Sequence, residues 1–347
     1  MKAIKLTLCV FLLALLSLTT GSQASAQAVD YATDPHLSES VKQFLNALNK
    51  PGPGLETLPI KDGRSVLVNA QKSVQVDLSG IEVSEKTITQ DGYTVKLNIV
   101  RPAGVKGILP VFIFIHGGGW VLGDFPTHER LVRDLVVLSG CEAVFPNYTP
   151  SPEARYPQAI HEIYAATKWV AEHGGEINVD GKRLAVAGNS VGGNMAAVTC
   201  LMAKDNNGPK IRFQLLLWPV TDATFDWPSC NLYGKQRFLT ASLMKWMFDQ
   251  YSTDPAQRKQ PYYSPLNASL QELKGLPPAL IQVAENDILR DQGEAYGRKL
   301  DEAGVKVTCV RFNGVIHDWG MLNGLANIPQ TRALVVQGAA ELKKYLK

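Results

Sequence analysis

The chain has 347 residues, of which 45% are hydrophobic and 19% charged, so it can bury a large core. It contains no internal repeat, low-complexity tract or long charge run that would indicate a second module. The formal net charge is only +3, and no basic stripe is interleaved with aromatic residues, which argues against a nucleic-acid partner.

Residues 1–26 have the pattern of an export signal. Lys2 and Lys5 precede the apolar run 6–18, and the small residues at 24–26 form an A-x-A cleavage site. The apolar run is shorter than the ~20 residues that span a bilayer, so we expect cleavage near Gln27, with an uncleaved anchor as the alternative. The signal holds two lysines and no acids, so without it the charge of +3 falls to +1. We expect an exported protein, periplasmic or secreted, without a stable membrane span.

The first element predicted after the signal is a helix over residues 38–48, closed by the Pro-Gly-Pro-Gly run at 51–54. Its apolar residues recur at helical spacing and predict one buried face, formed by Val41, Phe44, Leu45 and Leu48. Further on, residues 83–89 and 94–100 flank an Asp-Gly pair, which predicts a β-hairpin.

A continuous apolar run at 111–115 predicts a strand buried on both faces, and it leads into His116 and three glycines. Successive glycines leave backbone amides open to a ligand, and acyl transfer needs donors aimed at an oxyanion. We assign the amides of Gly118 and Gly119 to that role. The alternative is a flexible glycine loop. The helix expected at 158–172 then covers the sheet.

Ser190 lies at the centre of a Gly-x-Ser-x-Gly motif at 188–192. An apolar strand, 183–187, precedes the motif and a helix, 194–202, follows it. A sharp strand-to-helix turn strains the serine backbone and needs small neighbours, and it exposes the hydroxyl at a helix N-terminus. Ser190 is therefore the candidate nucleophile, and the Val191 amide is the third candidate oxyanion donor.

A strand at 213–218 precedes a segment rich in aromatic residues, 221–262. Within it, Trp246 and Met247 keep helical spacing and suit a packed helix equally well. The candidates for a substrate pocket are Phe225, Trp227 and Phe238, together with Trp120 after the glycine run.

Three carboxylates compete to orient a histidine. They follow a predicted strand at 279–284, and active sites of α/β sheets lie beyond such strand ends. Asp291 opens a predicted helix at 292–303 and suits a helix N-terminus. Asp287 is our choice for the acid, and Glu285 is the alternative.

Only one of the six histidines, His317, lies downstream of Ser190. Sheets with this serine turn place nucleophile, acid and histidine in that chain order, so His317 is the candidate base. It follows a strand predicted at 305–310. The order excludes the other histidines, which are His36, His116, His128, His161 and His173.

These motifs resemble those of the bacterial hormone-sensitive-lipase-like esterases of the α/β-hydrolase superfamily. The resemblance covers about residues 85–345 and includes HGGGWVLGD from His116, the Tyr148 to Pro157 stretch and the acid region from Asp287. Two positions depart from it. The serine turn usually reads GDSAGG and here has Asn189, and the Gly-Phe pair usual after the histidine is here Asp318-Trp319.

The resemblance implies an α/β-hydrolase domain at 27–347 with a mostly parallel eight-stranded sheet. A helical cap would come from about 27–60 and 221–262. It further implies a serine carboxylesterase acting on small short- to medium-chain acyl esters, without a metal or organic cofactor. An amidase or deacetylase on the same residues, an interfacial lipase and a non-catalytic ligand-binding protein are the alternatives.

Four cysteines follow the signal, and an even number in an exported protein permits disulfides. Cys200 lies in an apolar helix and Cys309 on a strand, so buried free thiols are the equal alternative for the set Cys141, Cys200, Cys230 and Cys309. A homodimer through the edge strand of the sheet is a further possibility for which no residue argues.

Overall fold

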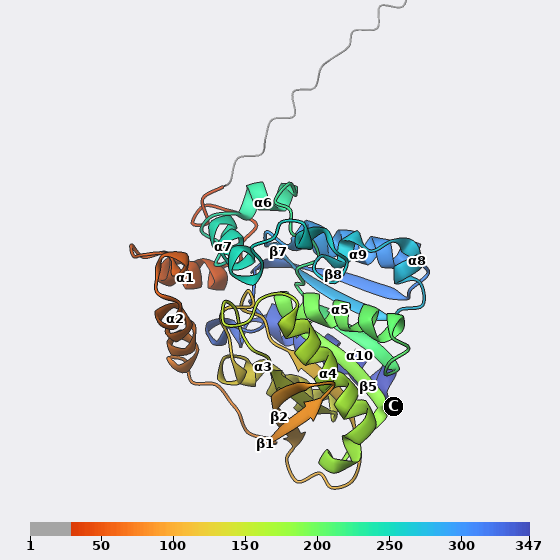
Figure 1. Ribbon diagram of the computed structural model, residues 1–347. Coiled ribbons are helices and arrows are strands. Elements are labelled where there is room, and N and C mark those ends of the chain that lie inside the picture. The colour runs from red at the N-terminus through yellow and green to blue at the C-terminus, as the bar shows by residue number, and fades with distance from the viewer. Residues whose placement is uncertain (1–28) are drawn as a thin grey trace, which may run out of the picture.

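The computed structural model describes residues 29–347, so the export signal expected at 1–26 lies outside the described residues. The predicted fold class is confirmed: one eight-stranded sheet runs through the molecule (Figure 1). In spatial order its strands are β1 (Ile81–Gln90), β2 (Tyr93–Pro102), β4 (Glu142–Asn147), β3 (Leu109–Ile115), β5 (Val179–Asn189), β6 (Ile211–Leu217), β7 (Ala279–Asn286) and β8 (Val307–Ile316).

The sheet is antiparallel at one end and parallel over the rest. β2 pairs antiparallel with both β1 and β4, whereas every pairing from β4 through β3 to β8 is parallel. The predicted hairpin is present, since Gln90 pairs with Tyr93 across Asp91 and Gly92. Both turn residues have positive φ, +51° and +83°, as the tight hairpin turn favoured by Asp-Gly requires.

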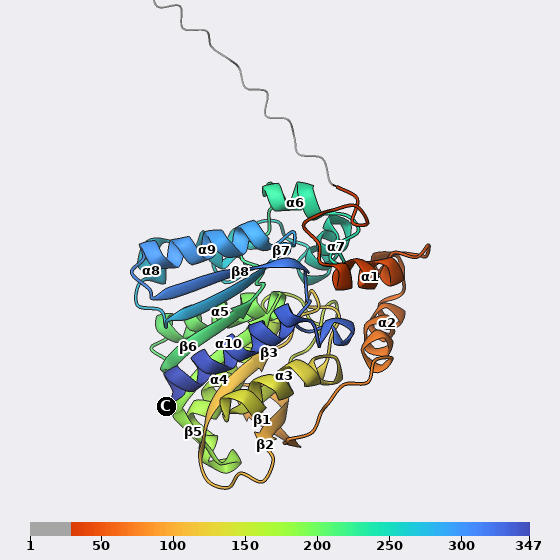
Figure 2. The same ribbon diagram turned by 180° about the vertical axis from the view of Figure 1, so that it is seen from behind.

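Helices cover both faces of the sheet, as Figures 1 and 2 show from opposite sides. On one face α3 (Phe125–Ser139) packs against α10 (Pro329–Leu346). On the other face α4 (Gln158–His173) packs against α5 (Val191–Asp205), and α9 (Arg290–Glu302) covers β7 and β8 together with the short α8 (Leu270–Leu273). Short 3-10 turns complete the described chain at Leu55–Thr57, Gly174–Ile177, Gln257–Lys259, Pro265–Asn267 and Asn323–Leu325.

The two expected cap segments lie together. The N-terminal segment forms α1 (Glu39–Leu48) and α2 (Ile60–Lys72), and the segment after β6 forms α6 (Pro228–Tyr233) and α7 (Ala241–Tyr251). In both views α1 and α7 are neighbours (Figures 1 and 2). A buried ion pair joins the segments, because Arg237 Nη2 lies 2.7 Å from Asp34 Oδ2.

The helix expected at 38–48 is confirmed as α1, with one change to its predicted buried face. Val41 and Leu45 are completely buried, whereas Leu48 in the last turn is 44% exposed and does not reach the core. No helix within the described residues is both long and apolar enough to cross a membrane.

Candidate active site

Ser190 stands between β5 and α5 in a strained backbone turn. Its φ of +55° is a conformation that residues other than glycine rarely adopt and that is typical of functional sites. A Cβ on Gly188 would lie 2.3 Å from the Gly192 carbonyl oxygen, and one on Gly192 would lie 2.0 Å from that of Ile115. Glycine at both positions therefore lets the turn pack directly against the end of β3.

The three residues chosen for nucleophile, base and acid lie together at the carboxyl ends of the strands. Ser190 follows β5, Asp287 follows β7 and His317 follows β8. His317 Nδ1 lies 2.7 Å from Asp287 Oδ2, and its Nε2 lies 3.0 Å from Ser190 Oγ. With the proton on Nδ1, the ring donates to Asp287 and accepts the hydrogen bond that the serine hydroxyl donates.

The other two carboxylates face elsewhere. Glu285 accepts the Gly314 amide at 2.8 Å and contacts His36 Nδ1 at 3.2 Å. Asp291 lies in the first turn of α9, as expected, and accepts the Ser229 amide at 2.8 Å. Of the three candidates, only Asp287 contacts His317 within the described residues.

Burial and charge act against each other at His317, which is 2% exposed. Desolvation lowers its pKa, but the carboxylates of Asp287 and Asp318 raise it further, so the net pKa lies above the usual 6.5. At the buried His116 and His128 desolvation outweighs the other influences, including the carboxylates of Asp124 and Asp318 near His128, and lowers the pKa of each to about 4. Both therefore stay neutral at physiological pH.

The glycine loop after β3, which we define as residues 116–122, lies against the serine turn. The Gly117 amide donates to Asn189 Oδ1 at 3.0 Å, and Gly118 and Gly119 have φ of +102° and +64°. In residues 29–347 the amides of Gly118, Gly119 and Val191 donate to no protein acceptor. These three amides remain available to a ligand, and their role as an oxyanion hole stays a prediction.

A second buried carboxylate, which sequence reasoning left without a role, completes the centre. Asp318 Oδ1 accepts Asn189 Nδ2 at 3.0 Å and Trp218 Nε1 at 2.6 Å, and its Oδ2 lies 3.7 Å from His317 Nε2. The two departures from the family pattern, Asn189 and Asp318, are therefore bonded to each other. The only signal in the sequence was that this chain departs from the family pattern at both positions, which lie far apart along the chain.

The segment after β6 covers the glycine loop. A Cβ on Gly119 would lie 2.0 Å from Met247 Sδ, so the α7 thioether rests directly on that residue. Trp120 is 1% exposed, and its ring stacks on that of Tyr251 with 4.1 Å between the ring centroids. It therefore lies inside an aromatic cluster under α7. The other pocket candidates, which are half-buried on the same segment, are Phe225, Trp227 and Phe238.

Ser190 itself is buried, with 4% of its surface exposed. Among the described residues no three His, Cys, Asp or Glu side chains are grouped so as to hold a metal ion. The four described cysteines are free. Three are buried, as the alternative of buried free thiols requires, whereas Cys309 is exposed on the edge strand β8 and does not fit that alternative.

A serine on a sharp strand-to-helix turn, in line with a histidine and a buried carboxylate, is the arrangement typical of hydrolases that use a serine nucleophile. A sequence profile described as the alpha/beta hydrolase fold matches residues 112–321. The chain belongs to this alpha/beta hydrolase family.

Relatives with known structures or activities agree with this class. The structure superposes on the crystal structure of a thermostable esterase from Pseudomonas putida ECU1011 with a TM-score of 0.90. The two sequences are 61% identical, and the match covers 90% of this chain and 99% of that one. The ethyl acetate hydrolase of Pseudomonas putida is 36% identical over 67% of this chain and 73% of its own length. Carboxylesterase NlhH of Mycobacterium tuberculosis is 34% identical over 78% of this chain and 84% of its own length.

Proposed function

We propose that the protein is a serine carboxylesterase that hydrolyses short- to medium-chain acyl esters through an acyl-enzyme. The observation that carries the proposal is His317, whose two ring nitrogens contact Ser190 Oγ at 3.0 Å and Asp287 Oδ2 at 2.7 Å. The names of its relatives, which include esterases and carboxylesterases, support an ester substrate.

In the first half of the reaction, Ser190 Oγ attacks the ester carbonyl carbon while His317 Nε2 takes the hydroxyl proton. Asp287 stabilises the imidazolium and holds its tautomer. The negative charge on the carbonyl oxygen of the tetrahedral intermediate would be received by the amides of Gly118, Gly119 and Val191, each such donor being worth about 3 kcal/mol. His317 then returns the proton to the departing alkoxide, leaving an acyl group on Ser190.

In the second half, water replaces the alcohol. His317 accepts a proton from this water as it attacks the acyl carbonyl, and it gives the proton to Ser190 Oγ when the carboxylic acid leaves. The enzyme is thereby restored. The reaction splits one difficult displacement into two steps with the same proton carrier.

The preference for short acyl groups is supported by the closeness of the cap. Met247 rests on Gly119, and Trp120 fills the space beneath α7. A relative named for hydrolysing ethyl acetate, whose acyl group has two carbons, is consistent with a short acyl pocket. Phe225, Trp227 and Phe238 are the side chains that we propose limit the acyl length.

The test is a series of initial rates on p-nitrophenyl esters from acetyl to dodecanoyl. We expect rates that peak at short acyl chains and fall at least about 10⁴-fold in Ser190→Ala and His317→Ala. A rate that the two variants share with the unmodified protein would refute the assignment. Ester rates at the level of the variants, with turnover of p-nitroanilides, would instead identify an amidase or deacetylase.

We also propose that the protein is exported, supported by the signal pattern in residues 1–26. Cell fractionation with mass determination of the N-terminus tests this, and a mature chain beginning near Gln27 in the periplasm or medium is expected. Full-length protein retained in the cytosol would contradict it. Light scattering distinguishes a monomer from a homodimer, which is the alternative.

A further inference from the structure

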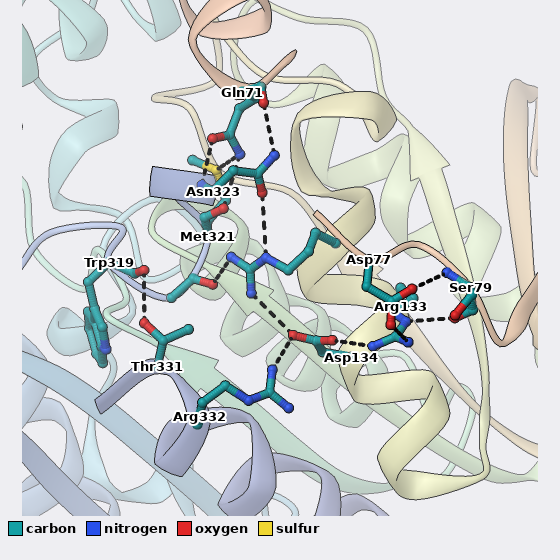
Figure 3. Close-up of polar contacts among 12 residues, drawn as sticks. Gln71, Asp77, Ser79, Arg133, Asp134, Trp319, Met321, Asn323, Thr331 and Arg332 are labelled. Carbon is teal, nitrogen blue, oxygen red and sulfur yellow. Dashed lines mark hydrogen bonds and ion pairs between the residues drawn. The ribbon is translucent and has the colours of Figure 1, made fainter. Parts of the chain in front are cut away.

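The loop that carries His317 is held by side chains from three helices. We call residues 317–323 the histidine loop. Its carbonyl groups at 319, 320 and 321 accept in succession from Thr331 Oγ1 at 3.3 Å, Arg130 Nη2 at 2.6 Å and Gln71 Nε2 at 3.0 Å (Figure 3). Thr331 comes from α10 and Arg130 from α3, the two helices that cover one face of the sheet. Gln71 comes from α2, in the N-terminal segment.

Both the nitrogen and the oxygen of the Gln71 side-chain amide form hydrogen bonds. Its Nε2 also donates to the Thr127 carbonyl at 2.7 Å, and its Oε1 accepts the Asn323 amide at 2.9 Å. The Gln71 backbone carbonyl accepts Asn323 Nδ2 at 3.0 Å, so three hydrogen bonds between nitrogen and oxygen atoms join Gln71 to the histidine loop (Figure 3). The residue is 3% exposed, and a buried amide with all partners in place is costly to disturb.

The same helix reaches the glycine loop through a second side chain. Arg64 lies two turns before Gln71, and Arg64 Nε donates to the Val121 carbonyl at 2.7 Å. Val121 is anchored in turn, because its amide donates to the Gly118 carbonyl at 3.2 Å. Arg64 is itself fixed by a two-pronged contact with Glu153 at 2.7 and 2.8 Å.

We infer that α2 is a strap that positions the catalytic centre, with Gln71 setting the histidine loop and Arg64 setting the glycine loop. Neither side chain contacts Ser190, His317 or Asp287 among the described hydrogen bonds, so both are positioning residues. The helix lies outside residues 112–321, the part that matches the family profile. The inference rests on the function proposed above and adds to it the segment that makes the centre competent.

The physical reason is the sensitivity of catalysis to small displacements. A misplacement of about 1 Å between reacting groups can cost on the order of 100-fold in rate. His317 must keep contact with two partners at once, and the oxyanion donors lie on a different loop. A strap bonded to both loops fixes their relative positions, which neither β3 nor β8 can do alone.

The test compares Gln71→Met, Arg64→Met and Asp77→Ala in the full chain. Methionine keeps the volume of glutamine and removes its hydrogen bonds. Asp77→Ala is the control for an exposed tie between the N-terminal segment and α3, because the Asp77 side chain is 63% exposed and contacts Arg133 of α3 but neither loop (Figure 3). All are assayed on the acetyl ester below their thermal midpoints.

We expect kcat to fall roughly 10- to 100-fold in Gln71→Met and Arg64→Met while KM changes less than about threefold. Asp77→Ala should keep the kcat of the unmodified protein even if its thermal midpoint falls. A merely structural role for α2 would lower thermal midpoints and leave kcat within twofold in all three variants, and that result would overturn the inference. If Gln71→Met does not fold, Asn323→Ala removes the side-chain amide that donates to the Gln71 backbone carbonyl, another bond between α2 and the histidine loop, and is judged by the same criteria.

A second readout separates this inference from the proposed function. The rate at which a fluorophosphonate labels Ser190 depends on the aligned loops and requires no turnover of an ester. Slower labelling in the two strap variants than in Asp77→Ala would support the strap even if no ester were hydrolysed. Equal labelling rates would refute the strap, whatever the substrate.

Discussion

The polar centre contains two carboxylates with different relations to one histidine. Asp287 contacts Nδ1 and fixes the ring, whereas Asp318 lies 3.7 Å from Nε2, on the side where the proton is exchanged. Both raise the pKa of His317 against the effect of burial. The charge state of the base therefore depends on a residue that stands where glycine is usual in the resembled family.

This arrangement predicts the acidic limb of the pH profile. The base works only when Nε2 is free, so kcat/KM should fall as the pH drops through a pKa above the usual ~6.5. Asp318→Asn keeps an acceptor for Trp218 and removes the charge, so the limb should move to lower pH. A profile of kcat/KM between about pH 5 and 9 checks this, and an unmoved limb would contradict it.

The Asn189 and Asp318 pair predicts that the family's usual residue is harmful here. Asn189→Asp would remove the Nδ2 donor and set two buried carboxylates side by side, with an expected loss of about 1–3 kcal/mol in the free energy of unfolding. Adding Asp318→Gly should recover part of that loss, because it removes the opposing charge and suits the φ of +59°. Urea unfolding of both single variants and the double variant measures the coupling, and additive effects would argue against a pair.

At the scale of elements, the serine turn depends on how closely α5 approaches β3. The sequence motif predicted this turn correctly because its cause is local: small residues must flank a strained serine. The same holds for the hairpin, where Asp91 and Gly92 have the positive φ that the turn requires. Such features are encoded within a few residues and can be predicted without the rest of the chain.

Gly192→Ala tests the close approach. The added Cβ would lie 2.0 Å from the Ile115 carbonyl oxygen, which belongs to β3 and cannot move aside. We expect a loss of about 1–3 kcal/mol or more in stability and a fall in serine-dependent activity. Gly175→Ala, where a Cβ meets nothing within 4 Å, is the control and should leave both unchanged. Thermal unfolding with activity assays would decide, and equal effects at the two sites would contradict the explanation.

Helix α2 shows why other elements could not be predicted from the sequence. Its buried residues are Gly63, Leu67 and Gln71, so a single large aliphatic side chain marks its inner face. The partners that bury Gln71 lie about 250 residues away, at Met321 and Asn323. A pattern based on periodic apolar residues has no signal for a face that is buried through hydrogen bonds.

For the whole molecule, chain order and spatial order together explain which functional residues were predictable. The order of serine, acid and histidine identified three residues that the sheet brings to one edge, because Ser190, Asp287 and His317 each follow a strand. Asp287 was preferred to Glu285, two residues away, from the sequence, but only the structure shows which carboxylate contacts His317, since the direction of each side chain depends on its neighbours. Asp318 gained its place only from contacts with Asn189, the last residue of β5, and Trp218, which follows β6.

The link between α2 and the histidine loop also bears on when activity first arises in the life of the chain. Gln71 is made early and Asn323 close to the end, and their contacts join the two. A ribosome must therefore complete nearly the whole protein before the centre can be assembled. A chain released too soon has Gln71 but lacks His317 and the loop that Gln71 holds, so truncated products of translation would carry Ser190 without the means to activate it.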